Sequence, residues 1–138
     1  MTCCFIGHKE PDREIFPTLI FTIINLIEKE GIDNFYMGNN GWFDRTCFNI
    51  VRTLQETEPH IIYNVVLAYY PGGIVGYEDN TIYPEGLELV PKRFAIKKRN
   101  EWMIDNSDYV VCHVKNHFSN AHKFREYAIK KNKKIIDI

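Results

Sequence analysis

The stretch from Gly38 to Asp44 has a composition that could bind a phosphate-bearing ligand. It reads GNNGWFD and stands between a predicted strand and a predicted helix. Glycine and asparagine tolerate positive φ, so such a loop can turn its N–H groups outward and cradle a phosphate or a ribose phosphate. Asp44 would cap the helix or accept hydrogen bonds from ribose hydroxyls. Glycine-rich loops also form simple tight turns, so both interpretations stay open. The candidate binding residues are Gly38, Asn39, Asn40, Gly41 and Asp44.

Gly7, His8 and Lys9 follow the first apolar run and form a second candidate site. Gly7 would let a ligand approach the backbone, and His8 and Lys9 offer hydrogen-bond donors to an anion. The alternative for this tripeptide is a plain turn that carries a solvated lysine.

A basic cluster forms the third candidate site, and it consists of Lys92, Arg93, Lys97, Lys98 and Arg99. Most charge runs of this kind are solvated helix faces. Within the cluster we expect Arg99 and its neighbour Asn100 to reach a pocket, because a guanidinium fork suits carboxylate or phosphate groups.

The elements that must position these residues follow from the hydrophobic pattern. Short apolar runs predict strands at residues 2–6, 35–37, 61–70, 109–114 and 134–138, and amphipathic runs predict helices at 15–30, 43–54, 92–106 and 121–132. Alternation of apolar strands with helices predicts an α/β fold, a Rossmann-like three-layer sandwich with a mainly parallel five-stranded sheet in the order 3-2-1-4-5. In such a sheet, ligands bind at the carboxyl ends of the strands, where the strand order reverses. The three candidate sites are expected to meet there.

Residues 71–91 carry glycine, proline and acidic residues without a clear period. They predict a long loop that covers the pocket and is the most mobile ordered segment. A strand, a loop and a helix separate His113, His117 and His122, which argues against a metal site.

The composition indicates a single globular domain over residues 1–138, with 45% hydrophobic and 25% charged residues. A net charge of −1 disfavours a nucleic-acid binder. The four cysteines lack zinc-site spacing, and the amino terminus lacks the pattern of a signal peptide, so we expect reduced thiols in a cytoplasmic protein with no membrane partner. No metal or cofactor is predicted, and a homo-oligomer is compatible with the composition.

Several segments together resemble the SLOG superfamily, Rossmann-like proteins that include the DNA-processing proteins and the lonely-guy cytokinin-releasing enzymes. Gly7-His8-Lys9 stands where the family has its first-strand glycine and basic turn. GNNGWFD matches the GxxGxxD-type loop of the YpsA-like branch, and RNEWM at 99–103 is similar to the RKxxM segment of lonely-guy enzymes. The PEG, PKRF and EYA segments at 84–86, 91–94 and 126–128 complete the YpsA-like pattern.

The junction after the fourth predicted strand departs from the lonely-guy enzymes. They carry PGGxGTxxE there, whereas this chain reads KNHFSNAHK at residues 115–123, without the glycines or the glutamate that serves the chemistry. The resemblance therefore implies a pocket for a nucleotide or nucleotide sugar, with Ser119 in this junction as a further ligand-binding candidate.

Three functions follow as hypotheses. The first is binding or sensing of a nucleotide-derived ligand, with Trp42 or Trp102 stacking on it. The second is cleavage of an N-glycosidic bond, which needs a carboxylate such as Asp44, Glu78 or Glu126. The third is single-stranded DNA binding, supported by the basic clusters at 92–99 and 130–134 and opposed by the balanced net charge.

Overall fold

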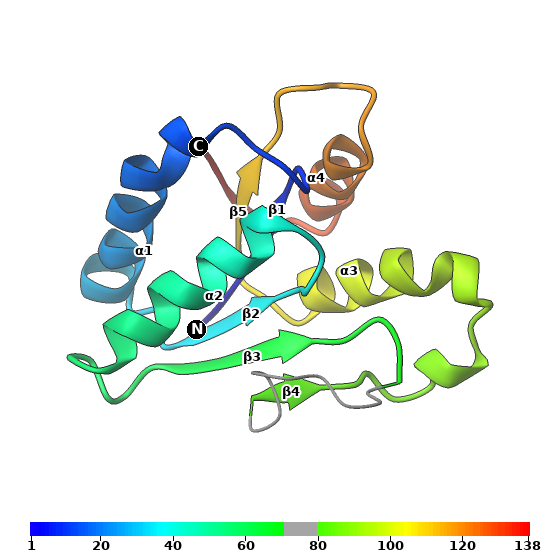
Figure 1. The fold of residues 1–138 in the computed structure, drawn as a ribbon, viewed down its shortest axis with the longest axis horizontal. Helices are drawn as coiled ribbons and strands as arrows, with labels where there is room; N and C mark the ends of the chain where they lie inside the picture. The colour runs from blue at the N-terminus through cyan, green and yellow to red at the C-terminus, as the bar shows by residue number, and fades with distance from the viewer. Residues whose placement is uncertain (71–79) are drawn as a thin grey trace.

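The computed structural model describes residues 1–70 and 80–138. Within these residues, six strands form one sheet in the order β4-β3-β2-β1-β5-β6, and all five pairings are parallel (Figure 1). The strands are β1 (Thr2–Gly7), β2 (Asn34–Met37), β3 (Ile62–Val66), β4 (Thr81–Ile82), β5 (Tyr109–His113) and β6 (Lys134–Asp137). The order predicted for the five longer strands is confirmed.

The prediction of five strands is wrong, because β4 lies in the segment predicted to be a loop. This strand has only two residues, which pair with Val65 and Val66, and two residues are too few to show an alternating pattern. The same segment also contains a 3₁₀ turn at Leu87–Leu89. The third predicted strand was too long, since β3 ends at Val66 and Tyr70, at the end of the apolar run, is 81% exposed.

Four helices connect the strands in the described ranges: α1 (Phe16–Glu30), α2 (Trp42–Gln55), α3 (Ala95–Asp105) and α4 (Asn120–Lys130). In α1, Pro17 occupies the first turn, where its missing N–H has no intrahelical role, and Gly31 ends the helix at φ 70°. The predicted helix at 92–106 begins instead as a 3₁₀ turn, Lys92–Phe94, and becomes α-helical at Ala95. None of these helices is long and apolar enough to cross a bilayer.

The sheet is covered on both faces because successive strand residues point to opposite sides. In β1, Cys3 and Phe5 pack into a core with α1 and α2, whereas Cys4 and Ile6 pack into a second core with α3 and α4. Figure 1 shows the two pairs of helices on opposite sides of β1 and β5. The cysteines are unpaired, buried thiols, and burial raises the pKa of Cys4 to about 12.

The connections after β1 and β5 leave the sheet in opposite directions. The chain runs from β1 to α1 on one face, and from β5 to α4 on the other. Neighbouring strands whose connections diverge in this way form the switch point at which open α/β sheets bind ligands.

Candidate functional site

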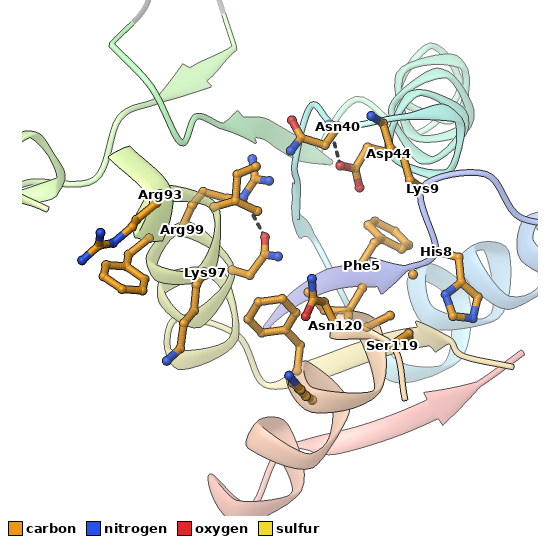
Figure 2. Close-up of a pocket in the computed structure, with 18 residues that line it drawn as sticks. Phe5, His8, Lys9, Asn40, Asp44, Arg93, Lys97, Arg99, Ser119 and Asn120 are labelled. Atoms are coloured by element: carbon orange, nitrogen blue, oxygen red, sulfur yellow. Dashed lines mark hydrogen bonds between the residues drawn. The ribbon is translucent and has the colours of Figure 1, made fainter. Parts of the chain in front are cut away.

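A cleft of about 640 Å³ lies at the carboxyl end of β1, between the start of α2, the start of α3 and the start of α4 (Figure 2). Its floor is formed by Phe5, Ile6 and Gly7 of β1. The remaining lining residues are His8, Lys9, Asn40, Asp44, Arg93, Phe94, Ile96, Lys97, Arg99, Asn100, Ser119, Asn120, Ala121, Lys123 and Phe124. The cleft therefore lies at the switch point, where open α/β sheets commonly bind ligands.

The charge of the cleft is strongly unbalanced, although the whole chain carries a net charge of −1. Its described lining includes a single carboxylate, that of Asp44, and five basic side chains, those of Lys9, Arg93, Lys97, Arg99 and Lys123. A concave site with walls of low dielectric concentrates such a field, so the cleft attracts anions.

The turn after β1 holds neighbouring elements as well as lining the cleft. A Cβ on Gly7 would lie 2.7 Å from the ring of Phe43, so this glycine makes room for a core side chain. His8 Nε2 accepts a hydrogen bond of 2.8 Å from the Lys115 N–H, which requires the neutral ring. Burial lowers the pKa of His8, and the neighbouring His113 and Lys115 lower it further.

The glycine-rich junction between β2 and α2, together with the first two residues of α2, directs three N–H groups to acceptors within the protein. The N–H groups of Trp42 and Phe43 donate to the Lys9 carbonyl at 2.8 and 3.4 Å. The Asn40 N–H donates to Asp44 Oδ2 at 2.9 Å. Gly41 has φ 93°, and a Cβ there would lie 2.5 Å from the Lys9 carbonyl oxygen. The loop is therefore built around a close contact with the β1–α1 turn.

Arg99 is a buried strut with 1% of its surface exposed. Its Nη1 donates to the Val66 carbonyl at 2.8 Å and to Asn39 Oδ1 at 3.2 Å, and its Nε donates to Asn100 Oδ1 at 2.7 Å. The side chain thus joins the ends of β2 and β3 to α3. Burial lowers the pKa of the guanidinium, and the Asp44 charge opposes that change.

Asp44 lies beside Arg99 at the wall of the cleft. A Cβ on Gly38 would be 2.7 Å from Asp44 Oδ2 and 2.9 Å from Arg99 Cζ, so the absence of a side chain at Gly38 lets both groups approach its backbone. Burial raises the pKa of the Asp44 carboxyl, whereas Arg99 and the Asn40 N–H lower it. Arg99 and the Asn40 N–H thus favour the charged carboxylate, against the effect of burial.

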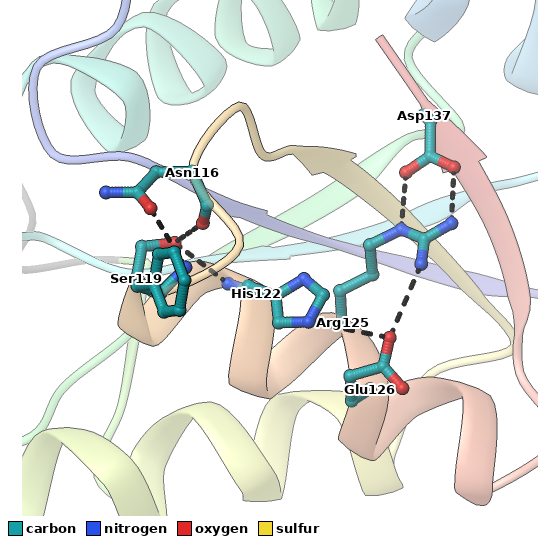
Figure 3. Close-up of polar contacts among 7 residues, drawn as sticks. Asn116, Ser119, His122, Arg125, Glu126 and Asp137 are labelled. Carbon is teal, nitrogen blue, oxygen red and sulfur yellow. Dashed lines mark hydrogen bonds and ion pairs between the residues drawn. The ribbon is translucent and has the colours of Figure 1, made fainter.

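The junction between β5 and α4 presents a helix start to the cleft. Ser119 Oγ accepts the His122 N–H at 3.2 Å and donates to the Asn116 carbonyl at 2.6 Å (Figure 3). The next two residues, Asn120 and Ala121, line the cleft, and N–H groups in the first turn of a helix have no intrahelical acceptor. They add partial positive charge to the basic lining.

The predicted binding residues divide into two groups. Those that line the cleft are Gly7, His8, Lys9, Asn40, Asp44, Arg99, Asn100 and Ser119. Those that are not among its lining residues are Gly38, Asn39 and Gly41, which instead shape the junction behind it.

The other predicted site residues lie elsewhere. Glu126 pairs with Arg125 and His122 on α4, at 3.7 and 3.8 Å (Figure 3). Glu78 lies outside the described residues. Trp42 contacts Arg13, Trp102 packs against Tyr36, and neither tryptophan is among the residues that line the cleft.

Several lining residues were missed by the sequence analysis. Phe94 belongs to the 3₁₀ turn before α3, and Asn120, Lys123 and Phe124 belong to the first turns of α4. Arg93 and Lys97, two members of the predicted basic cluster, also line the cleft. Residues three or four apart lie on one helix face, so the spacing of Asn120 and Phe124 was the available signal.

The segment predicted to cover the pocket does not do so in its described part. Residues 84–87 and Val90 instead line a second cavity of about 350 Å³, together with Lys98, Glu101, Trp102, Asp105 and Tyr127. Residues 71–79 lie outside the described residues, and the mobility of the segment stays a prediction.

The two basic clusters considered for DNA binding lie at opposite edges of the sheet. The 92–99 cluster begins at the carboxyl edge with the start of α3, and the 130–134 cluster joins the end of α4 to the start of β6 at the amino edge.

A comparison of the chain with protein-family models and with curated proteins finds no match in either set.

Proposed function

We propose that this protein binds a nucleotide or a nucleotide-sugar-derived ligand in the cleft at the carboxyl end of β1. The observation that carries the proposal is the charge of the cleft, with five basic side chains and one carboxylate in its described lining. Arg93 comes from the 3₁₀ turn before α3, Lys97 from α3 and Lys123 from α4, and their positive charges attract phosphate groups to the cleft.

The start of α4 supports the same ligand chemistry. The N–H groups of Asn120 and Ala121 lie at the cleft and are suited to receive a phosphate, as helix amino termini often do. The resemblance to the SLOG superfamily is a further argument, because Gly7-His8-Lys9 and Arg99-Asn100 both contribute residues to the cleft.

The test is calorimetric titration of the wild-type protein with AMP and ADP-ribose. Lys97 and Lys98 are adjacent on α3, but Lys97 lines the cleft and Lys98 lines the second cavity, where it pairs with Glu101. We expect Lys97→Ala to weaken binding roughly fivefold, as the loss of one positive charge at the binding site would. The matched control Lys98→Ala should bind as wild type. Absence of binding by the wild type, or equal losses in both variants, would contradict the proposal.

A second candidate function, cleavage of an N-glycosidic bond, is favoured by the position of Asp44. Its carboxylate is held by the Asn40 N–H at the wall of the cleft, where it would face the sugar of a bound nucleotide. An oxocarbenium-like transition state is stabilised by such a carboxylate. Chromatography of AMP incubated with the protein would show release of the base by the wild type and none by Asp44→Asn; no release by the wild type would leave binding as the function.

A further inference from the structure

The two ends of the cleft differ in chemistry. Toward β1 and α2 its lining is polar, with His8, Lys9, Asn40 and Asp44 (Figure 2). Toward α3 it contains Arg93 and Lys97, with the aromatic ring of Phe94 beside them in the sequence. A ligand that fits both ends would have one polar part and one flat, aromatic part.

Phe94 is an aromatic side chain that the core does not use. It closes the 3₁₀ turn Lys92–Phe94, its side chain is 43% exposed, and it belongs to neither hydrophobic core. The guanidinium of Arg93 lies over its ring, 4.9 Å from the centroid. Both groups are planar, and both stack on aromatic rings.

Phe124 supplies a second ring from the opposite helix. It lies one helical turn after Asn120, so the two residues share the face of α4 that lines the cleft. Phe124 is partly buried and packs against the core between α3, α4 and the sheet, which anchors its ring. Two phenylalanines, one from the 3₁₀ turn before α3 and one from α4, therefore line the same cleft.

We infer that Phe94 and Phe124 form the subsite for the aromatic base of the ligand, so that the protein takes base-bearing nucleotides in preference to sugar phosphates. This inference rests on the proposed function. Every nucleobase has a π face, and stacking on aromatic side chains contributes strongly to binding without hydrogen bonds to the base edges. The ribose and phosphate then point toward Lys9 and the start of α4, where the donors are.

This orientation of the ligand, with its base at Phe94 and Phe124, also fits the positions of two lysines in the cleft. Lys97 and Lys123 line the cleft together with Phe94 and Phe124. Cations beside a stacked base strengthen the contact through the π system. A sugar phosphate without a base would leave both rings exposed to water.

The experiment compares AMP with ribose 5-phosphate, which is the same sugar phosphate without its base. Both compounds are titrated calorimetrically into the wild type, Phe94→Leu and Phe124→Leu, with Phe118→Leu as the control. Phe118 is 95% exposed and is absent from the cleft lining, so its substitution leaves the subsite intact. Thermal unfolding of each variant shows that it is folded, and the exposed position of Phe94 keeps that variant informative if Phe124→Leu is unstable.

We expect the wild type to bind AMP at least tenfold more tightly than ribose 5-phosphate. Phe94→Leu and Phe124→Leu should each lose about fivefold in affinity for AMP and keep their affinity for ribose 5-phosphate, while Phe118→Leu matches the wild type. If the wild type binds AMP and both cleft variants bind it equally well, the base subsite is overturned and nucleotide binding stands. If the wild type binds neither compound nor ADP-ribose, both the inference and the proposed function are overturned.

Discussion

The junctions β2–α2 and β5–α4 both lead from the carboxyl end of a strand into a helix, yet they treat their N–H groups differently. At β2–α2, the Lys9 carbonyl accepts the first two N–H groups of the helix, and Asp44 accepts the Asn40 N–H. At β5–α4, Ser119 accepts the His122 N–H, and the two residues between them, Asn120 and Ala121, line the cleft.

The difference shows that the glycines of the β2–α2 junction allow close packing against neighbouring residues instead of exposing N–H groups to a ligand. The glycine-rich junction is held against the β1–α1 turn, and the junction without glycine offers its helix start to the cleft. A loop of N–H groups binds an anion only where those groups have no internal acceptor. Three variants test this comparison, from the largest expected effect to the smallest.

Gly41→Ala should have the largest effect, because its Cβ would overlap the Lys9 backbone and its φ of 93° disfavours any side chain. We expect a loss of about 3 kcal/mol or more in the free energy of unfolding, measured in urea. Gly86→Ala is the matched control, with φ 85° and nothing within 4 Å of the new Cβ, and it should lose about 1 kcal/mol. Equal losses would show that the contact with Lys9 does not hold the β2–α2 junction.

Arg99→Met should be the next largest, because it removes the hydrogen bonds to the Val66 carbonyl and Asn39 and leaves Asp44 buried without its neighbouring cation. We expect a loss of about 3 kcal/mol in unfolding free energy. Arg93→Met, at an exposed position on the same segment, should stay within about 0.5 kcal/mol of wild type. A stable Arg99→Met variant would mean that Arg99 is not a strut and is available to a ligand.

His8 should give the smallest effect, and it depends on pH. The pKa of His8 is lowered in the folded protein, so between that value and the unfolded value of about 6.5 the folded state binds fewer protons than the unfolded state. Stability from the His8–Lys115 hydrogen bond is therefore complete above that window and is lost as pH falls through the folded pKa.

An NMR titration of the His8 ring checks this directly, together with urea unfolding of His8→Ala across the same pH range. The wild type should exceed His8→Ala by about 1 kcal/mol at pH 8, with the difference shrinking at pH 5. His60→Ala serves as the control, because His60 is an exposed ring that pairs with Glu58. A difference that is independent of pH would rule out the His8–Lys115 bond as its source.

The sequence was sufficient for the order of the longer strands, because each of them is an apolar run separated by an amphipathic helix. It was insufficient for β4, because this strand has only two residues and both pair with the backbone of β3. The end of β3 was also hidden, since Leu67 and Ala68 are buried like strand residues although the strand stops at Val66.

For predicting the cleft, polar and charged side chains were a better guide than the glycines of the β2–α2 junction. His8, Lys9 and Asn100 line it as expected, and Gly38 and Gly41 do not. Phe124 was missed because an aromatic residue at helical spacing between Ala121 and Ala128 has the pattern of a core position. In the structure α3 packs against α4, and Phe124 lines the cleft beside them.

The most direct test is an amide chemical-shift titration of the ¹⁵N-labelled protein with ADP-ribose. If a nucleotide binds in the cleft with its phosphates at the start of α4, the amides of Asn120 and Ala121 should shift most. The amides of Trp42 and Phe43, which already donate to Lys9, should shift little. Large shifts at Trp42 and Phe43 with none at Asn120 and Ala121, or no shifts at all, would contradict nucleotide binding at this site.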